Sequence, residues 1–254
     1  MKVLHMSRVL LLLLTGVIAL GCNRSANNSS STQSTPSPAP VAGPALTIRE
    51  GESPAGTDSR EPDLYSTRDG RRVLLSWVEK VGEKRYALRF VARDEREWSE
   101  VRTVAEGENW FINWADFPSV IELTDGTLAA HWLVKSGPGT YSYDVNISRS
   151  SDGGKTWGKP VVPHTDGTQT EHGFVSLIPL PDGRLGASWV DGRALHGMKE
   201  GEEEHEGPLP VSMALRYAAI DASGKVSDEA VLDERICECC QTSAALTAEG
   251  PLIV

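Results

Sequence analysis

The chain has 254 residues, of which 35 are acidic and 25 basic, and its formal net charge is −10 at pH 7. This balance excludes nucleic acid as an expected partner, because binding to phosphates draws on clustered Lys and Arg side chains. It also offers no polybasic patch for adsorption to a membrane surface. Without its N-terminal leader the chain keeps roughly 210 residues, enough for one large domain or for part of a larger one.

An apolar run over residues 9–20 follows two basic side chains and ends at a Gly-Cys pair. This pattern is typical of an export signal, and about a dozen apolar residues are too few for a membrane-spanning helix of about 20. Residues 18–22 resemble a bacterial lipobox, which implies that Cys22 is acylated and becomes the new N-terminus; a plain secreted protein is the alternative. We predict a signal peptide over residues 1–21 and an exported protein, lipid-anchored to a bacterial membrane and facing the periplasm or the cell surface.

Residues 22–46 begin with this cysteine and continue as a segment rich in Ser, Asn, Thr and Pro. Such a composition cannot bury enough apolar surface to offset the entropy lost on folding. We therefore predict a disordered linker here and a folded domain over residues 47–254.

Three similar stretches follow, each with an Asp-Gly turn and then an apolar strand that carries a tryptophan. The turn aspartates are 56 and 57 residues apart, and a fourth turn of the same kind begins at Glu249. Each repeat has a second half with two more strands around a turn, so each unit accommodates four short strands. Four-stranded units in tandem predict an all-β fold, the β-propeller. The aspartates are Asp69, Asp125 and Asp182, and the tryptophans, which we expect in the core between blades, are Trp77, Trp132 and Trp189.

The number of repeats predicts an incomplete ring. The repeats start near residues 60, 114, 171 and 237, so the folded segment holds fewer than four complete blades. Ring closure takes about four to eight blades. We predict a partial propeller with about three and a half blades of a six-bladed ring; the alternative is a four-bladed ring that residues 45–50 close.

One turn, in the second repeat, carries a dense set of polar and aromatic residues. Its carboxylate can accept hydrogen bonds from the N–H groups of the turn, while its glycines supply positive φ angles. The tryptophan that follows can bury its ring against a neighbouring blade. We interpret the motif as a structural hairpin clasp and not as a catalytic site. Its residues are Ser150, Asp152, Gly154, Thr156 and Trp157.

This motif resembles the Asp-box, or BNR repeat, of bacterial neuraminidases, S-x-D-x-G-x-T-W, and degenerate copies extend the resemblance over residues 47–254. The chain is thus similar to the sialidase superfamily and to exported sialidase-like lipoproteins of bacteria. The resemblance implies a sialidase-like β-propeller that binds a glycan or glycoconjugate. If the protein is an enzyme, it implies a glycoside hydrolase of the exo-α-sialidase type that requires no cofactor. The alternative is a non-catalytic propeller that binds glycan, protein or metal.

Residues just before the innermost strand of each blade should cluster around the axis on one face, together with the loops between second and third strands. Asp116 stands there beside aromatic residues and is the candidate acid/base, since burial could raise its pKa; a strand-capping role is the alternative. Arg60 takes the place of the carboxylate-binding arginine in the sialidase R-I-P motif, although Glu61 replaces the apolar residue. The predicted substrate-binding residues are Arg60, Trp114, His172, Asp191 and Arg193.

Three cysteines near the C-terminal end, Cys237, Cys239 and Cys240, form a C-x-C-C motif that is unusual in an exported chain. With Cys22 acylated, an odd number of thiols remains, so one is unpaired, bound to metal or bonded to a residue beyond the sequence given. A disulfide to such a residue is one hypothesis. A thiolate site for Cu(I) or Zn, with a histidine such as His172 as a further ligand, is the other.

Overall fold

The computed structural model describes residues 47–48, 50–94, 97–198 and 212–254. Residues 51–254 form one compact unit, and residues 1–50 are a separate unit. The predicted signal peptide, the lipidation site at Cys22 and the linker up to residue 46 lie outside the described residues. In the described ranges no helix is long and apolar enough to cross a membrane.

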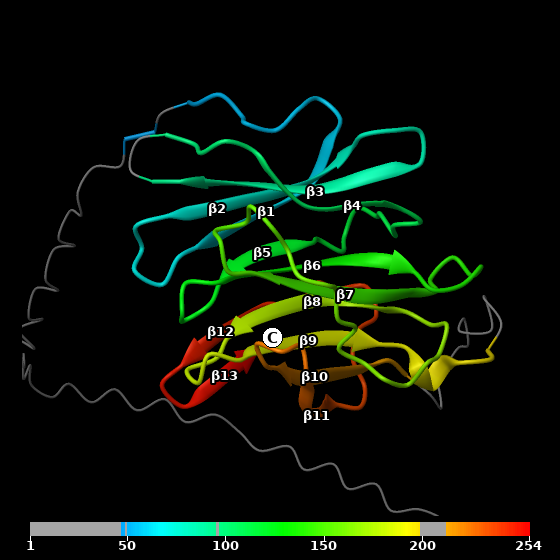
Figure 1. The fold of residues 1–254 in the computed structure, drawn as a ribbon. Helices are drawn as coiled ribbons and strands as arrows, with labels where there is room; N and C mark the ends of the chain where they lie inside the picture. The colour runs from blue at the N-terminus through cyan, green and yellow to red at the C-terminus, as the bar shows by residue number, and fades with distance from the viewer. Residues whose placement is uncertain (1–46, 49, 95–96, 199–211) are drawn as a thin grey trace, which may run out of the picture. The chain divides into compact units, whose positions relative to one another are not determined.

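Thirteen β-strands make up the described part of residues 51–254, with one short 3-10 helix, η1 (Figure 1). In chain order the elements are β1 (Ser59–Ser66), β2 (Val73–Lys80), β3 (Arg85–Arg93), β4 (Arg102–Glu108), β5 (Ser119–Glu122), β6 (Leu128–Lys135), β7 (Tyr143–Ser150), β8 (His172–Pro179), β9 (Leu185–Asp191), η1 (Arg193–Leu195), β10 (Ala214–Ile220), β11 (Val226–Asp233), β12 (Ala244–Thr247) and β13 (Gly250–Ile253).

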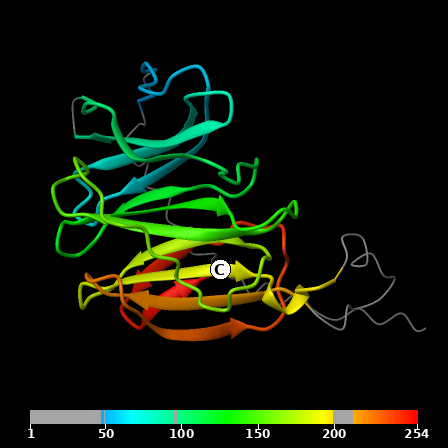
Figure 2. The ribbon, with the colours of Figure 1, turned by 45° about the vertical axis from the view of Figure 1, so that its right-hand side comes forward.

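The strands form four antiparallel sheets in simple meander order: blade 1 (β1–β4), blade 2 (β5–β7), blade 3 (β8–β11) and blade 4 (β12–β13). Neighbouring blades touch through their first strands, β1 with β5, β5 with β8, and β8 with β12. Figure 2 shows the first three sheets following one another in chain order, from blue through green to orange. These four first strands also line a common cavity of about 310 Å³. Sheets that share a hub through their first strands are the blades of a propeller. The predicted all-β propeller fold is confirmed.

Blade 2 differs from the predicted four-stranded unit, because only three of its strands are regular. The outer position is held by Val161, which exchanges both backbone hydrogen bonds with Ile147 of β7, at 2.8 and 2.9 Å. Pro160 and Pro163 lie on either side of this bridge. Proline has no N–H to donate, so the pairing ends at Pro163, while on the other side the Gly158 N–H still donates to the Arg149 carbonyl at 2.9 Å.

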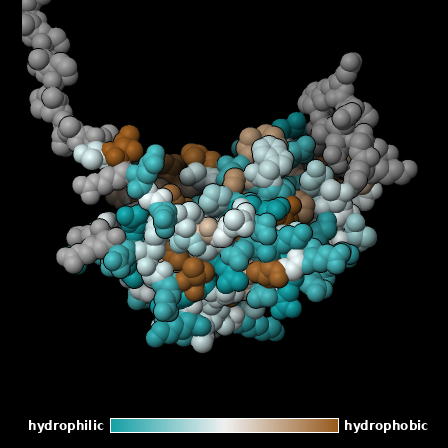
Figure 3. Space-filling model, turned by 90° about the horizontal axis from the view of Figure 1, so that it is seen from above, coloured by the Kyte–Doolittle hydropathy of each residue, from teal (hydrophilic) through white to brown (hydrophobic). Residues whose placement is uncertain are grey.

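Apolar side chains from neighbouring blades pack together in the interfaces. One cluster joins blades 2 and 3 and includes Trp189 and Tyr143, while another joins blades 1 and 2 and includes Phe90 and Trp132. Trp77, Trp132 and Trp189 are all buried, as the repeat pattern predicts. Burial of an aromatic side chain contributes about 1.5–3 kcal/mol each. The outer surface seen from above the sheets is mainly hydrophilic, with scattered apolar patches (Figure 3).

The turn of residues 150–157 is closed by side-chain hydrogen bonds. Oδ1 of Asp152 accepts the backbone N–H groups of Lys155 and Thr156 at 3.0 and 2.9 Å, and its Oδ2 accepts the Thr156 hydroxyl at 2.7 Å. Ser150 donates its hydroxyl to Asp152 Oδ1 at 2.8 Å and accepts the N–H of Gly154. These bonds stabilise the charged carboxylate and lower the pKa of Asp152.

The same turn packs on blade 1. Trp157 meets Phe90 of β3 edge to face, with ring centroids 6.1 Å apart. Gly154 has a φ of 86°, and a Cβ there would lie 2.3 Å from Cζ of Phe90. Only glycine meets both conditions, the left-handed backbone and the close approach of a ring. The turn therefore fastens blade 2 to blade 1.

Candidate functional site

A pocket of about 520 Å³ opens on the side where the innermost strands begin. It is built from the segments that precede β5, β8 and β12, from the β6–β7 loop and from the region of η1. We call it the strand-start pocket. Its described lining includes Asn113, Trp114, Tyr141, Gln169, Glu171, Leu195, His196, Met213, Glu238 and Cys239. The sequence predicted that such segments meet on one face, and here they share one pocket.

The turn before β5 exposes one side chain and buries another two residues later in the chain. Oδ1 of Asn113 accepts the N–H groups of Ala115 and Asp116 at 2.7 and 2.8 Å, which fixes the turn. Trp114 is consequently 87% exposed, at the pocket, while Asp116 is 2% exposed. Trp114, a predicted substrate-binding residue, therefore lines the pocket, and Asp116, the predicted acid/base, is buried and does not line it.

Asp116 is linked to the pocket through the buried phenol of Tyr143. The Tyr143 hydroxyl donates to Oε1 of Glu171 at 2.8 Å and lies 3.4 Å from Oδ2 of Asp116. A phenol has one proton, so the Tyr143 hydroxyl donates it over the shorter contact, to Glu171. The longer contact, with Asp116, is a weak alternative. Phe111 stacks on Tyr143 with ring centroids 3.8 Å apart and fixes the ring. Glu171 lines the pocket.

Burial sets the protonation of this cluster. It raises the pKa of Asp116 to about 7, although the Phe174 N–H and the Tyr143 hydroxyl partly oppose the shift. Burial, with Asp116 and Glu171 as neighbouring carboxylates, raises the pKa of Tyr143 above its usual value. Asp116 can therefore hold or release a proton near neutral pH, while Tyr143 stays protonated.

Gly173 makes the close approach of these groups possible. A Cβ on this residue would lie 2.0 Å from Oδ2 of Asp116 and 2.8 Å from the hydroxyl oxygen of Tyr143. Any other residue would push the Asp116 carboxyl and the Tyr143 phenol away from β8. The glycine is thus a steric requirement of the cluster.

A second buried carboxyl, that of Glu61 in β1, faces the same region. Burial raises its pKa to about 8, opposed by the charge of Arg60 and reinforced by that of Asp116. Glu61 has a φ of 52°, and Phe174 has 51° at the corresponding bulge of β8. The strain of the left-handed backbone therefore recurs in blades 1 and 3. Arg60 itself is exposed and lies outside the described lining of the strand-start pocket.

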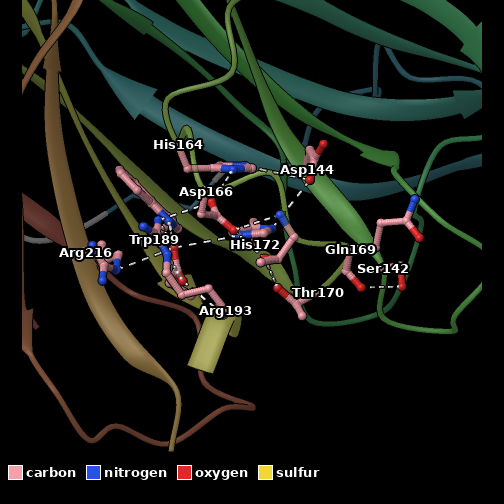
Figure 4. Close-up of polar contacts among 12 residues, drawn as sticks. Ser142, Asp144, His164, Asp166, Gln169, Thr170, His172, Trp189, Arg193 and Arg216 are labelled. Atoms are coloured by element: carbon pink, nitrogen blue, oxygen red, sulfur yellow. Dashed lines mark hydrogen bonds and ion pairs between the residues drawn. The ribbon is translucent and has the colours of Figure 1, made fainter. Parts of the chain in front are cut away.

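The remaining predicted substrate-binding residues, His172, Asp191 and Arg193, form a polar network beside the pocket and do not line it (Figure 4). Asp191 is fully buried, accepts the Trp189 indole N–H at 2.7 Å and pairs with Arg193 at 2.7 Å. His172 is buried and stacks on His164. Adjacent side chains along a strand point to opposite sides, so Glu171 faces the pocket and His172 faces away.

The three cysteines of the C-x-C-C motif lie together on the surface. Sγ of Cys237 is 3.3 Å from that of Cys239 and 3.4 Å from that of Cys240, and all three thiols are exposed and free. A hydrogen bond from the Cys239 N–H, with those from the other two thiols, lowers the pKa of Cys237. The cluster can therefore supply thiolate to a soft metal ion or form a disulfide.

Sequence reasoning missed Tyr143, Gly173 and His164. Tyr143 and Glu171 form a parallel β-bridge, although 28 residues separate them in the chain. No motif marks this pairing, which only the packing of blade 2 against blade 3 creates. The one available signal was that Glu171 directly precedes a predicted innermost strand.

No protein-family model matches the sequence, and a comparison with curated proteins also found no match. Among solved structures, the α-L-arabinanase of Penicillium chrysogenum complexed with arabinobiose is similar, with 17% identity, a TM-score of 0.51, and coverage of 77% of this chain and 58% of that one. The GH93 α-L-arabinofuranosidase of Fusarium graminearum with arabinobiose has 16% identity, a TM-score of 0.52 and the same coverages.

The K499G mutant of the NanB sialidase of Streptococcus pneumoniae also matches, with 15% identity, coverage of 75% of this chain and 26% of that one, and a TM-score of 0.43. The chain spans less than two thirds of the length of each of these proteins. At such low identity the similarity shows the fold alone. It places this chain in the class of β-propellers built from four-stranded blades.

Proposed function

We propose that the protein is an exported, lipid-anchored, sialidase-like β-propeller that binds a glycan in the strand-start pocket. The observation that carries this proposal is the pairing of exposed aromatic rings with carboxylates in one pocket, on the side where the innermost strands begin. Trp114 and Tyr141 are 87% and 54% exposed, and Glu171 and Glu238 stand beside them. Aromatic faces stack on the C–H groups of a sugar ring, and carboxylates accept hydrogen bonds from its hydroxyls.

The charge of the pocket favours an uncharged sugar. Its described lining holds two carboxylates and neither Lys nor Arg. An acidic sugar such as sialic acid would meet repulsion there, since an anion is bound by bidentate Arg or by another cation. The two solved structures reported above that contain arabinobiose, a neutral disaccharide, share only the fold with this chain, and they supply arabinobiose as the neutral sugar to test. Sialic acid remains the second candidate, with Arg60 as its carboxylate ligand.

Hydrolysis by this pocket would rest on Glu171 and Asp116. A glycosidase needs one carboxyl that holds a proton near neutral pH and one that is ionised. The pKa of Asp116, about 7, suits the first role. Its burial keeps it from touching a ligand, so it would act through Tyr143 on Glu171. We propose Glu171 as the carboxylate that contacts the ligand and Asp116 as the residue that positions it. Sugar binding is the primary function that we propose.

Calorimetric titration of the full chain with arabinobiose and with 3′-sialyllactose tests the proposal. We expect arabinobiose to bind, and Trp114→Ala to weaken binding about tenfold, the equivalent of about 1.4 kcal/mol. Trp98→Ala, outside the pocket, is the matched control. Binding of sialyllactose alone, abolished by Arg60→Ala, would establish the second candidate. Binding of neither sugar, or an unchanged affinity in Trp114→Ala, would refute the proposal.

The thiol cluster supports a separate proposal, a soft-metal site formed by Cys237, Cys239 and Cys240. The observation in its favour is the pair of Sγ separations of 3.3 and 3.4 Å. Metal analysis of protein purified under reducing conditions should find Cu(I) or Zn in the parent and none in the variant with all three cysteines replaced by Ser. Equal metal content in the two proteins would contradict it.

Lipid anchorage through Cys22 is tested by cell fractionation. The parent chain should sediment with bacterial membranes. Cys22→Ser should release it, because the variant lacks the thiol that would carry the lipid. Cys237→Ser is the control for loss of a thiol elsewhere. Equal membrane association of the parent and Cys22→Ser would rule out the anchor.

A further inference from the structure

The C-x-C-C motif contains a C-x-x-C pair, Cys237 and Cys240, and the structure places these two residues at the ends of a turn. Residues 238 and 239 form the turn between them. A four-residue turn brings its first and last Cα atoms within about 7 Å of each other, and a disulfide spans about 4.4–6.8 Å between Cα atoms. The backbone of this segment therefore suits a disulfide between the two cysteines.

The two sulfurs of this pair are already close. Sγ of Cys240 lies 3.4 Å from Sγ of Cys237. The sulfurs of a disulfide are about 2.0 Å apart, so a bond requires a further approach of about 1.4 Å. Both side chains are exposed, and rotation about their χ1 angles can supply this movement without a change in the core.

Both flanks of the turn are tied to blade 3. Before the turn, the N–H of Ile236 donates to the carbonyl of Met213 at 3.1 Å, and the Ile236 side chain packs on a small apolar cluster that includes Met213. After the turn, the side-chain amide of Gln241 donates to the carbonyl of Val175 at 3.0 Å. The fold therefore holds the turn in place and leaves its thiols at the surface, where an external disulfide can reach them.

Hydrogen bonds distinguish Cys237 from the other two thiols. The N–H of Cys239 and the thiols of Cys239 and Cys240 donate to its sulfur and lower its pKa, although the charge of Glu238 opposes the shift. The thiolate is the nucleophilic form of cysteine, and the first cysteine of a C-x-x-C pair commonly has a lowered pKa. Cys237 is therefore the thiol that attacks most readily.

Cys239 is the competing partner for Cys237, since their sulfur atoms are 3.3 Å apart. Hydrogen bonds to Cys237 and Cys240 raise the pKa of Cys239 to about 11, so its thiol stays protonated near neutral pH. A protonated thiol does not attack a disulfide. Cys240 remains as the second reactive thiol, and Cys239 stays free beside the strand-start pocket, which it lines.

We propose that Cys237 and Cys240 form a thiol–disulfide exchange site, in which Cys237 attacks an external disulfide that is open to solvent and Cys240 resolves the product. In the first step the sulfur of Cys237 bonds to one substrate sulfur, and the bond between the two substrate sulfurs breaks. The first substrate thiolate leaves and takes a proton from solvent. A mixed disulfide between Cys237 and the other half of the substrate remains.

The second step closes the C-x-x-C pair. Cys240 loses its proton to solvent, and its sulfur attacks Sγ of Cys237. The bond between Cys237 and the substrate breaks, and the second substrate thiolate leaves and takes a proton from solvent. In sum, the two cysteines lose two electrons and become a disulfide, and the substrate disulfide gains two electrons and becomes two thiols.

This site and the soft-metal site proposed above use the same thiols in different states. A soft ion needs reduced thiolates, whereas exchange leaves Cys237 and Cys240 oxidised. The exchange assay therefore uses protein freed of metal by a chelator, and a protein that is purified without metal can still exchange. Sugar binding in the strand-start pocket is measured separately and does not depend on either result.

The test uses the full chain with Cys22→Ser, in which the thiols of the motif are the only ones left. The reduced, metal-free protein is mixed with oxidised glutathione, quenched with acid and blocked with N-ethylmaleimide, and mass spectrometry examines the tryptic segment 236–254. We expect a disulfide between Cys237 and Cys240, N-ethylmaleimide on Cys239 alone, and two molecules of reduced glutathione released per chain. A parallel arm with insulin, a protein disulfide, shows by its relative rate which source of disulfide the site prefers.

Three serine variants assign the roles of the thiols. Cys240→Ser should stop at a mixed disulfide that holds one glutathione on Cys237. Cys237→Ser should react at least about tenfold more slowly than the background. Cys239→Ser is the matched control, because it keeps the backbone N–H that donates to Cys237; it should form the disulfide within about threefold of the background rate.

Circular dichroism checks that each variant is folded, which we expect because the replaced thiols are exposed. The proposal is overturned if the background protein forms no disulfide with either oxidant, or if Cys237→Ser reacts at the background rate. A disulfide that still forms in Cys240→Ser would also overturn it, since Cys239 would then be the resolving thiol.

Discussion

The phenolic oxygen of Tyr143 lies 2.8 Å from Oε1 of Glu171, and this contact joins blade 2 to blade 3 at the floor of the strand-start pocket. Tyr143 is the first residue of β7, and Glu171 immediately precedes β8. The contact therefore couples the position of a pocket carboxylate to the junction of two blades. The affinity of a ligand that binds Glu171 would therefore depend on how blades 2 and 3 pack at this junction.

Replacement of Tyr143 by Phe tests this coupling. The variant keeps the ring that stacks on Phe111 and loses only the hydroxyl. We expect a decrease in the free energy of unfolding of about 1 kcal/mol, as for one hydrogen bond, and weaker arabinobiose binding because Glu171 is no longer oriented. Chemical denaturation and calorimetric titration measure the two effects. Tyr86→Phe in β3 is the control, and equal sugar affinity in the two variants would contradict the coupling.

A change of Gly173 to Ala tests the steric basis of the cluster. The added methyl would lie 2.0 Å from Oδ2 of Asp116, so the carboxyl, the phenol of Tyr143 or β8 must move. We expect a loss of about 1–3 kcal/mol in the free energy of unfolding. Gly51→Ala, where nothing lies within 4 Å, should leave stability nearly unchanged. Similar unfolding midpoints for the two variants would show that the cluster tolerates the methyl.

The raised pKa of Asp116 predicts a pH-dependent difference between the parent and Asp116→Asn. From about pH 4 to 7 the folded carboxyl keeps a proton that the unfolded chain releases, so the unfolded state binds fewer protons and stability falls as pH rises. We expect the parent to lose about 2–4 kcal/mol relative to Asp116→Asn over this range. Denaturant titrations from pH 4 to 8 measure the difference.

Titrating groups that do not interact with Asp116 cancel in this comparison, because both proteins contain them; Glu61, whose pKa the charge of Asp116 helps to raise, contributes part of the difference. Glu61, with a pKa of about 8, acts with the same sign as Asp116. The buried His131 and His164 have lowered pKa values and act with the opposite sign below about pH 6.5. Tyr143, whose pKa is raised, keeps its proton over the range. A stability difference that is independent of pH would refute the raised pKa of Asp116.

The repeat was readable from the sequence because turns and strands are local. Asp69, Asp125 and Asp182 recur at regular spacing, and the buried tryptophans follow them at similar offsets. The position of Trp114 just before an innermost strand placed it on the strand-start side, where the structure finds it on a pocket. Such features depend on a few neighbouring residues, so no knowledge of blade packing was required.

The side to which a residue points could not be read in the same way. Glu171 and His172 are neighbours in the chain, yet one lines the pocket and the other is buried between blades. The hydrogen bond of Tyr143 to Glu171 arises only when blades 2 and 3 meet. This contact carries the candidate chemistry of the strand-start pocket, and no local pattern encodes it.

Replacement of Asp152 by Ala tests whether the turn of residues 150–157 holds two blades together. The change removes the acceptor of three hydrogen bonds from Lys155 and Thr156, and so frees the turn that places Trp157 on Phe90 of blade 1. We expect a lower midpoint of thermal unfolding and faster hydrogen exchange in β3 as well as β7, because the interface between the blades loosens. Asp182→Ala removes a turn aspartate of blade 3 that lies outside this interface, so it should speed exchange near β9 and leave β3 unchanged. If Asp152→Ala speeds exchange in β7 only, the turn closes its own hairpin and does not fasten the blades.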